Sequence, residues 1–193
     1  MSTADEEIDL GPLACRAAEG DAAATEALLA RVRPLIVRYC RARLGGRDGG
    51  RGSADDVAQE VCLAVLTALP RYVDRGRPFV AFAYGIAAHK VVDAQRLHAV
   101  RSDPSGELPD TADLADGPEQ IAVSAERTHG LHRLLAMLPD MQREVVILRI
   151  AVGMSAREVA DSLGMSAGAV RVAQHRALSR LRMLAAAEAE LVS

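Results

Sequence analysis

The sequence contains no tryptophan, and only 3% of its 193 residues are aromatic. Alanine, leucine, valine and arginine dominate instead, and this composition favours helices over strands. Half of the residues are hydrophobic, which is enough to build the core of one large domain or of two small ones. The expected fold class is therefore all-α.

The chain also lacks signals for a membrane, a metal or a secreted fold. No apolar stretch approaches the roughly 20 residues of a membrane helix, and the acidic N-terminus does not resemble a signal peptide. The three cysteines stand singly, His129 and His132 form a lone pair, and no Glu-x-x-His pair suits a di-metal bundle. We expect a cytoplasmic protein with no membrane insertion, catalytic residue, metal or cofactor, which disfavours a helical enzyme.

The net charge of -3 argues against a nucleic-acid partner at first sight. The charges are segregated, however. Residues 31–52, 71–101 and 165–184 carry +6, +4 and +4, whereas residues 1–30 and 102–126 carry -6 and -7. Basic and acidic surfaces are therefore predicted to alternate along the chain.

One acidic stretch divides the chain. Residues 102–118 read SDPSGELPDTADLADGP, with three prolines, two glycines and no basic residue, which opposes regular structure. Residues 102–117 are thus predicted to be a flexible linker between two small helical domains, residues 1–101 and 118–193. Helical periodicity or capping signals predict helices over residues 22–44, 53–69, 78–98, 119–138, 140–152, 156–163 and 166–187.

A helix-turn-helix is predicted over Ala156–Ala173. Ser155 and Glu158 form a capping box for its first helix, Gly164 supplies the turn, and Ser166 caps the last helix. That helix displays several arginines, which suits contacts with phosphates and with the major groove. The alternative is an ordinary packed helix pair with a solvated basic face.

Four of the five aromatic residues fall within thirteen positions and alternate with arginines. Aromatic rings stack on unpaired bases with about 1–3 kcal/mol each, and arginines neutralise the backbone, so this segment suits single-stranded DNA. Helical spacing also allows a core role, which is favoured for Phe82, whereas function is favoured for Tyr72 in the turn. The cluster comprises Arg71, Tyr72, Arg75, Arg77, Phe79, Phe82 and Tyr84.

Two stretches, one starting SADDVAQEVCLAVLTALPRYVDRGRPF and the other LPDMQREVVILRIAVGMSAREVADSLGMSAGAV, resemble regions 2 and 4 of extracytoplasmic-function sigma factors. The resemblance covers residues 19–100 and 119–184. It implies a protein that binds core RNA polymerase, recognises the -35 and -10 promoter elements and helps to open DNA, and it leaves room for an anti-sigma factor as a further partner. The alternative is a one-component helix-turn-helix regulator that acts without polymerase.

The resemblance assigns roles to matching positions. The clamp helices of the largest polymerase subunit are expected to contact Asp55, Asp56, Gln59 and Glu60, while the flap of the second largest subunit is expected to bind region 4. The -10 element is expected to contact Arg71, Tyr72, Arg75, Arg77, Phe79, His89, Lys90, Asp93 and Arg96. The -35 element is expected to contact Ser166, Arg171, Gln174, His175, Arg176 and Arg180.

Three departures from the family pattern concern DNA contacts. Phe82 stands where the family often has tryptophan, and Ala88-His89 stands where it often has Arg-Asn. Val172-Ala173 replaces the usual Ser-Arg of the last helix. We therefore expect phosphate contacts from Arg171, His175, Arg176 and Arg180.

Overall fold

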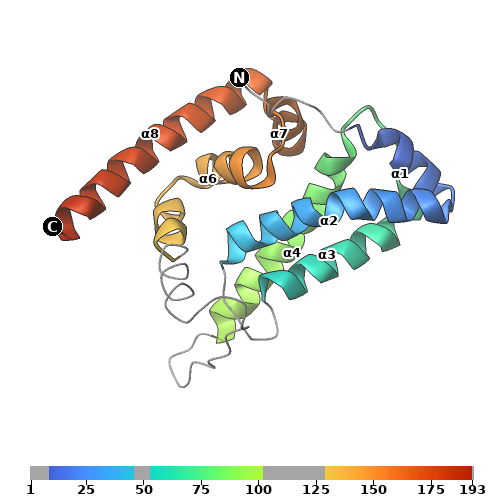
Figure 1. Ribbon diagram of the computed structural model, residues 1–193, viewed down its shortest axis with the longest axis horizontal. Helices are drawn as coiled ribbons and strands as arrows, with labels where there is room; N and C mark the ends of the chain where they lie inside the picture. Colours follow the sequence, from blue (N-terminus) through green and yellow to red (C-terminus); the bar gives the residue numbers. More distant parts are fainter. Residues whose placement is uncertain (1–8, 46–52, 102–128, 193) are drawn as a thin grey trace.

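The computed structural model describes residues 9–45, 53–101 and 129–192 (Figure 1). All regular structure within these ranges is helical, as the composition predicted. The expected linker, residues 102–117, lies outside the described residues. In the part of the chain that the structure describes, no helix is both long and apolar enough to cross a membrane.

The first described half forms a bundle of helices, here called the N-terminal bundle. Within it α2 contacts α1, α3 and α4. The Asp21 side chain caps α2 by accepting a hydrogen bond from the Ala24 amide at 2.9 Å, and Ser53 caps α3 in the same way through the Asp56 amide at 3.1 Å. The elements are α1 (Gly11–Ala18), α2 (Ala22–Leu44), α3 (Ala54–Ala68), the 3-10 turn η1 (Leu69–Arg71) and α4 (Phe79–Arg101).

The second described half, residues 129–192, is here called the C-terminal unit. Its residues 129–136 are helical, and α6 passes directly into the π-helical turn η2, so the predicted helix over residues 140–152 is continuous. The long helix α8 packs on α6 and α7. The named elements are α6 (Asp140–Val146), η2 (Ile147–Val152), α7 (Ala156–Leu163) and α8 (Ala167–Val192).

The predicted helix-turn-helix is present as α7 and α8. Ser155 and Glu158 form the complete capping box, and the Ser166 hydroxyl accepts from the Ala169 amide at 3.1 Å. Gly164 ends α7 with a φ of 66°, a left-handed backbone conformation that residues other than glycine adopt only at an energetic cost. These local signals confirm the predicted turn.

The two halves pack against each other rather than standing apart. Helix α2 contacts η2, and α4 contacts α7 (Figure 1). One hydrophobic core includes buried side chains of both halves, such as Leu28 and Val91 from the N-terminal bundle and Leu148 and Val152 from the C-terminal unit. A separate small cluster, built around Leu135, Leu138, Val146 and Ala177, holds α6 and α8 together.

Candidate nucleic-acid and polymerase interfaces

A hollow of about 430 Å³ lies beside the turn that connects η1 to α4. Three exposed arginines, one at the end of η1 and two in the turn, line it together with two aromatic side chains and the start of α4. The turn is shaped by Gly76, which has a φ of 71°, and by the Asp74 carboxylate, which accepts from the Gly76 amide at 2.8 Å. Lining residues include Arg71, Tyr72, Arg75, Arg77 and Phe82, and from α7 also Asp161 and Ser162.

The two phenylalanines exchange the roles that the sequence suggested. Phe79 is only 1% exposed and belongs to the core, whereas Phe82 is half-buried and lines the hollow. The buried face of α4 repeats every fourth residue, through Phe79, Ala83, Ala87 and Val91. This phase places Phe79 in the core, and it leaves Phe82 as the phenylalanine that an unpaired base can reach.

Tyr72 packs against both phenylalanines, which also contact each other at a centroid distance of 5.4 Å. Its ring centroid lies 5.1 Å from that of Phe79 and 5.2 Å from that of Phe82, both in edge-to-face geometry. Its hydroxyl oxygen is buried and has no hydrogen-bond partner among the described residues. Burial, more than the nearby Asp74 carboxylate, raises the pKa of Tyr72. The tyrosine therefore supports the wall of the hollow as well as lining it.

A second, shallower hollow continues along α4 from the first. It is lined by Phe82, His89, Lys90 and Asp93, among others, and Arg96 is exposed further along the same helix. The Lys90 ammonium lies 3.2 Å from a carboxylate oxygen of Glu60 on α3, and both side chains are substantially exposed. Exposed ion pairs of this kind contribute at most about 1 kcal/mol, so Lys90 can exchange this partner for a phosphate.

Three of the four residues expected to bind polymerase line a groove between α2 and α3, whereas Glu60 does not line it and is paired with Lys90. Asp55, Asp56 and Gln59 are among its lining residues. Arg41 of α2 donates two hydrogen bonds to Asp55, at 2.9 and 2.8 Å, and these bonds lower the pKa of that carboxyl. The sequence analysis missed Leu63, which lines the same groove and is 58% exposed. Leu63 does not fall on the helical spacing of the buried residues of α3. That spacing was the signal in the sequence that could have identified it as exposed.

The outer face of α8 carries most of the residues expected to contact the -35 element. Arg171, His175, Arg176 and Arg180 are exposed. Ser166 is also exposed, and it caps the helix. These positions leave side chains free to reach a DNA duplex.

Gln174 lies differently from its neighbours on α8. It is half-buried, and its side-chain oxygen accepts a hydrogen bond from the Nε of Arg149 at 3.1 Å. Arg149 also donates to the backbone carbonyl of Met154. The sequence analysis did not single out Val172 as a contact, although it is 50% exposed on the same helix. An apolar side chain among exposed arginines was the signal that could have found it.

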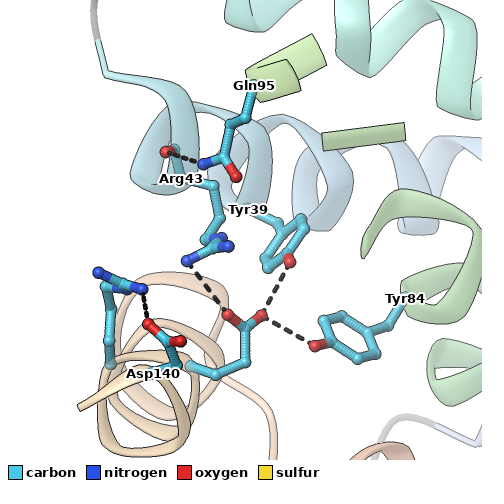
Figure 2. Close-up of polar contacts among 7 residues, drawn as sticks. Tyr39, Arg43, Tyr84, Gln95 and Asp140 are labelled. Atoms are coloured by element: carbon cyan, nitrogen blue, oxygen red, sulfur yellow. Dashed lines mark hydrogen bonds and ion pairs between the residues drawn. The ribbon is translucent and has the colours of Figure 1, made fainter. Parts of the chain in front are cut away.

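One charged side chain is held between the two halves of the chain (Figure 2). The Glu144 Oε1 accepts hydrogen bonds from the hydroxyls of Tyr39 and Tyr84, each at 2.8 Å, and Oε2 lies 3.4 Å from the Arg43 guanidinium. The side chains of Glu144 and Arg43 are only 13% and 14% exposed. Burial, followed by the Glu144 charge, raises the pKa of both tyrosines, so they remain hydrogen-bond donors. The carboxylate is thus well paired although it is almost buried.

Together, a helix-turn-helix and an arginine-lined aromatic hollow define a helical DNA-binding protein. Residues 28–100 match the family Sigma-70 region 2, and residues 129–181 match the family Sigma-70, region 4. No group of three or more His, Cys, Asp or Glu residues within the described ranges is arranged to hold a metal ion.

Whole-length relatives agree with these two matches. The chain is 54% identical over 187 residues to the ECF RNA polymerase sigma factor ShbA of Streptomyces griseus, covering 94% of this chain and 97% of ShbA. It is 53% identical over 174 residues to SigD of Mycobacterium tuberculosis, covering 90% and 82%. The structure of CnrH in complex with the cytosolic domain of CnrY matches with a TM-score of 0.66 and 29% identity, covering 93% and 97%. The chain belongs to the ECF RNA polymerase sigma factors, which are initiation factors and not enzymes.

Proposed function

We propose that this sigma factor captures an unpaired base of the -10 element in the hollow between η1 and α4. The observation that carries this proposal is the composition of the hollow, in which Phe82 offers an aromatic surface and Arg71, Arg75 and Arg77 surround it. Stacking on Phe82 compensates part of the cost of extruding a base, and the arginines neutralise adjacent phosphates. The exposed face with His89, Lys90, Asp93 and Arg96 extends this surface along α4.

The second DNA contact in this proposal is made by α8 in the major groove of the -35 element. Arg176 and Arg180 contact phosphates, while Arg171 and His175 approach base edges. Val172 adds an apolar contact with the methyl group of a thymine, a contact that apolar side chains make in the major groove. Because the oxygen of Gln174 is engaged by Arg149, Gln174 offers its amide N–H groups to a base acceptor.

Core polymerase binds the groove between α2 and α3 in this proposal. Asp55, Asp56 and Gln59 present polar groups there, and the exposed Leu63 supplies an apolar contact in the same groove. Glu60 adds a carboxylate on α3 outside the groove, where it is paired with Lys90. The flap of the second largest subunit contacts the C-terminal unit, and the factor works in the cytoplasm, where it meets polymerase.

Because the similar CnrH forms a complex with the cytosolic domain of CnrY, we also propose that an anti-sigma protein can hold this chain. The two DNA-binding domains are joined through residues 102–117.

Transcription on two templates tests the role of the hollow. Phe82→Ala in reconstituted holoenzyme should lower run-off transcription from a duplex promoter about 5- to 100-fold, as expected for the loss of one stacking contact. A template that is already mismatched over the -10 element should recover part of the loss, because unpairing no longer opposes capture. Val92→Ala, also on α4 but away from the hollow, is the matched control. Equal losses on both templates, or loss of polymerase binding, would contradict the proposal.

A further inference from the structure

We propose that Arg149 determines which base the last helix of the helix-turn-helix recognises, although Arg149 lies on η2 and not on α8. By holding the side-chain oxygen of Gln174, it leaves that amide with hydrogen-bond donors only and turns its base preference from adenine to guanine. The inference rests on the proposed function, because it names the specificity of one contact between α8 and the -35 element. Arg149 is thus a positioning residue that acts on DNA through Gln174.

Gln174 lies at the border between the buried and the exposed face of α8. Val170 and Ala177 are fully buried on the inner face, whereas Arg171 and His175 are exposed. Gln174 is half-buried between these two faces. Because residues three apart lie side by side on a helix, Gln174 is next to Arg171 and reaches the edge of the surface that is proposed to face DNA.

The hydrogen bond to Arg149 fixes which end of the Gln174 amide points outward. The Arg149 Nε donates to the Gln174 Oε1 at 3.1 Å. A guanidinium has donors and no acceptor, whereas an amide has one oxygen that accepts and one nitrogen that donates. Rotating the amide by half a turn would place its N–H groups against a positively charged donor. Only the orientation with the oxygen toward Arg149 therefore forms this bond.

Arg149 is itself held in place. Its Nη1 donates to the backbone carbonyl of Met154, so two of its nitrogens are bound. Both hydrogen bonds are partly buried, and hydrogen bonds from a charged donor are stronger than those between neutral groups. Arg149 belongs to the π-helical turn η2, and such turns occur frequently at functional sites. The turn brings a fixed positive charge to the inner edge of α8.

The outward end of the Gln174 amide remains available to a ligand. Its Nε2 has no hydrogen-bond partner within the described ranges, and it is not one of the buried side-chain atoms that lack a partner there. An amide nitrogen that is neither bonded nor buried is in contact with solvent. Its two N–H groups can therefore bind a base edge without breaking a bond within the protein.

Hydrogen-bond donors alone discriminate between the purines in the major groove. Guanine presents two acceptors there, N7 and O6, whereas adenine presents the N7 acceptor beside its N6 amino donor. An amide that is free to use both ends pairs with adenine through N6 and N7. The Gln174 amide held by Arg149 has no acceptor left for N6, so an adenine would keep one donor unpaired. Guanine is therefore favoured at the base that Gln174 faces.

Competitive binding of a promoter pool tests this assignment. Holoenzyme reconstituted with the full chain binds duplex promoters in which every base pair of the -35 element is randomised, and sequencing of the bound fraction gives the preference at each position. Gln174→Ala identifies the position that Gln174 contacts, because the preference there should disappear. Arg149→Leu removes the donor to Gln174. Arg182→Leu, which removes an exposed arginine of α8, is the matched control.

At the position so identified, the parent and Arg182→Leu should prefer guanine over adenine. Arg149→Leu should shift the ratio of guanine to adenine roughly tenfold toward adenine, as expected for one bidentate contact, and should leave the other positions unchanged. Arg149→Lys keeps a donor for the Gln174 oxygen and should retain the parent preference. In the Gln174→Ala background, Arg149→Leu should have no effect on preference, because its influence on DNA passes through Gln174.

An unchanged preference in Arg149→Leu would overturn the proposal, and so would a shift that persists in the Gln174→Ala background. Gln174→Glu decides the question if Arg149→Leu does not fold, because it keeps the contact with Arg149. A carboxylate has acceptors and no donor, so the preference should turn to cytosine, which presents an N4 donor, whereas a retained preference for guanine would contradict the proposal. A failure of the proposed function looks different. In that case the parent holoenzyme shows no preference at any position of the -35 element.

Discussion

Tyr72 offers a test that separates the packing of the hollow from its contact with DNA. Its hydroxyl oxygen is buried without a hydrogen-bond partner among the described residues, and such a group costs about 1–3 kcal/mol. Tyr72→Phe removes the oxygen and keeps the ring. We therefore expect it to raise the free energy of unfolding by about 1 kcal/mol, the lower end of that range because the residue is only half-buried.

Tyr72→Ala should behave in the opposite way. It removes edge-to-face contacts with Phe79 and Phe82, at centroid distances of 5.1 and 5.2 Å, and it opens a cavity against the core. The expected loss is about 3 kcal/mol, near the lower limit for aromatic side chains in cores. Part of any loss of transcription by Tyr72→Ala would then reflect a displaced Phe82 rather than a missing contact of Tyr72 with a base.

Urea unfolding followed by circular dichroism measures both variants, and run-off transcription from duplex and mismatched templates measures their function. Tyr72→Phe should unfold at a higher urea concentration and open the promoter at least as well as the parent. A loss of stability of 1 kcal/mol or more in Tyr72→Phe would refute the reasoning, because it would show that the hydroxyl has a stabilising partner. A fully stable Tyr72→Ala would refute the packing role of the ring.

Three further predictions concern the helix-turn-helix and the polymerase groove. Ser155→Ala breaks the capping box of α7 and should cost about 1–2 kcal/mol in urea unfolding, whereas Ser179→Ala on α8 should cost less. Replacing one -35 thymine by uracil, which lacks the methyl group, should weaken DNA binding by the parent but not by Val172→Ala. Arg180→Ala should weaken binding to every sequence about equally in competition assays. Because the hydrogen bonds from Arg41 hold the pKa of Asp55 below its usual range, the pair stabilises the fold while the carboxyl is ionised and loses its effect as the pH falls through the lowered pKa. Asp55→Asn should therefore lower stability more at pH 7 than at pH 2.

The sequence predicted those features that depend on residues close together in the chain. The capping box of Ser155 and Glu158 and the turn at Gly164 need only local hydrogen bonds and one backbone angle, so a short motif determines them. The order of helices followed from periodicity for the same reason. These elements supply the scaffold of the helix-turn-helix and of the hollow.

The features that the sequence did not reveal depend on contacts between distant segments. Glu144 bonds to Tyr84 and to Tyr39, which lie 60 and 105 residues away in the chain, and no local pattern encodes such a pairing. The exchange of roles between Phe79 and Phe82 arose because both fit a helical apolar stripe, and only the packing of α4 selects one phase. Gln174 was assigned to base contacts because α8 is polar there, whereas Arg149, brought close by η2, engages its oxygen.

Lys90 is a unique site for chemical labelling of this protein, since it is the only lysine in the sequence. An amine-reactive reagent at mildly alkaline pH therefore modifies one side chain, apart from the amino terminus. That side chain lies between Glu60 on α3, with which it is paired, and the hollow along α4 that it lines. Two events should each change its rate of acylation. Polymerase would occupy Glu60, and a DNA strand would shield the amine. The amount of acylated Lys90, measured over time by mass spectrometry, can thus show the order in which polymerase and DNA bind.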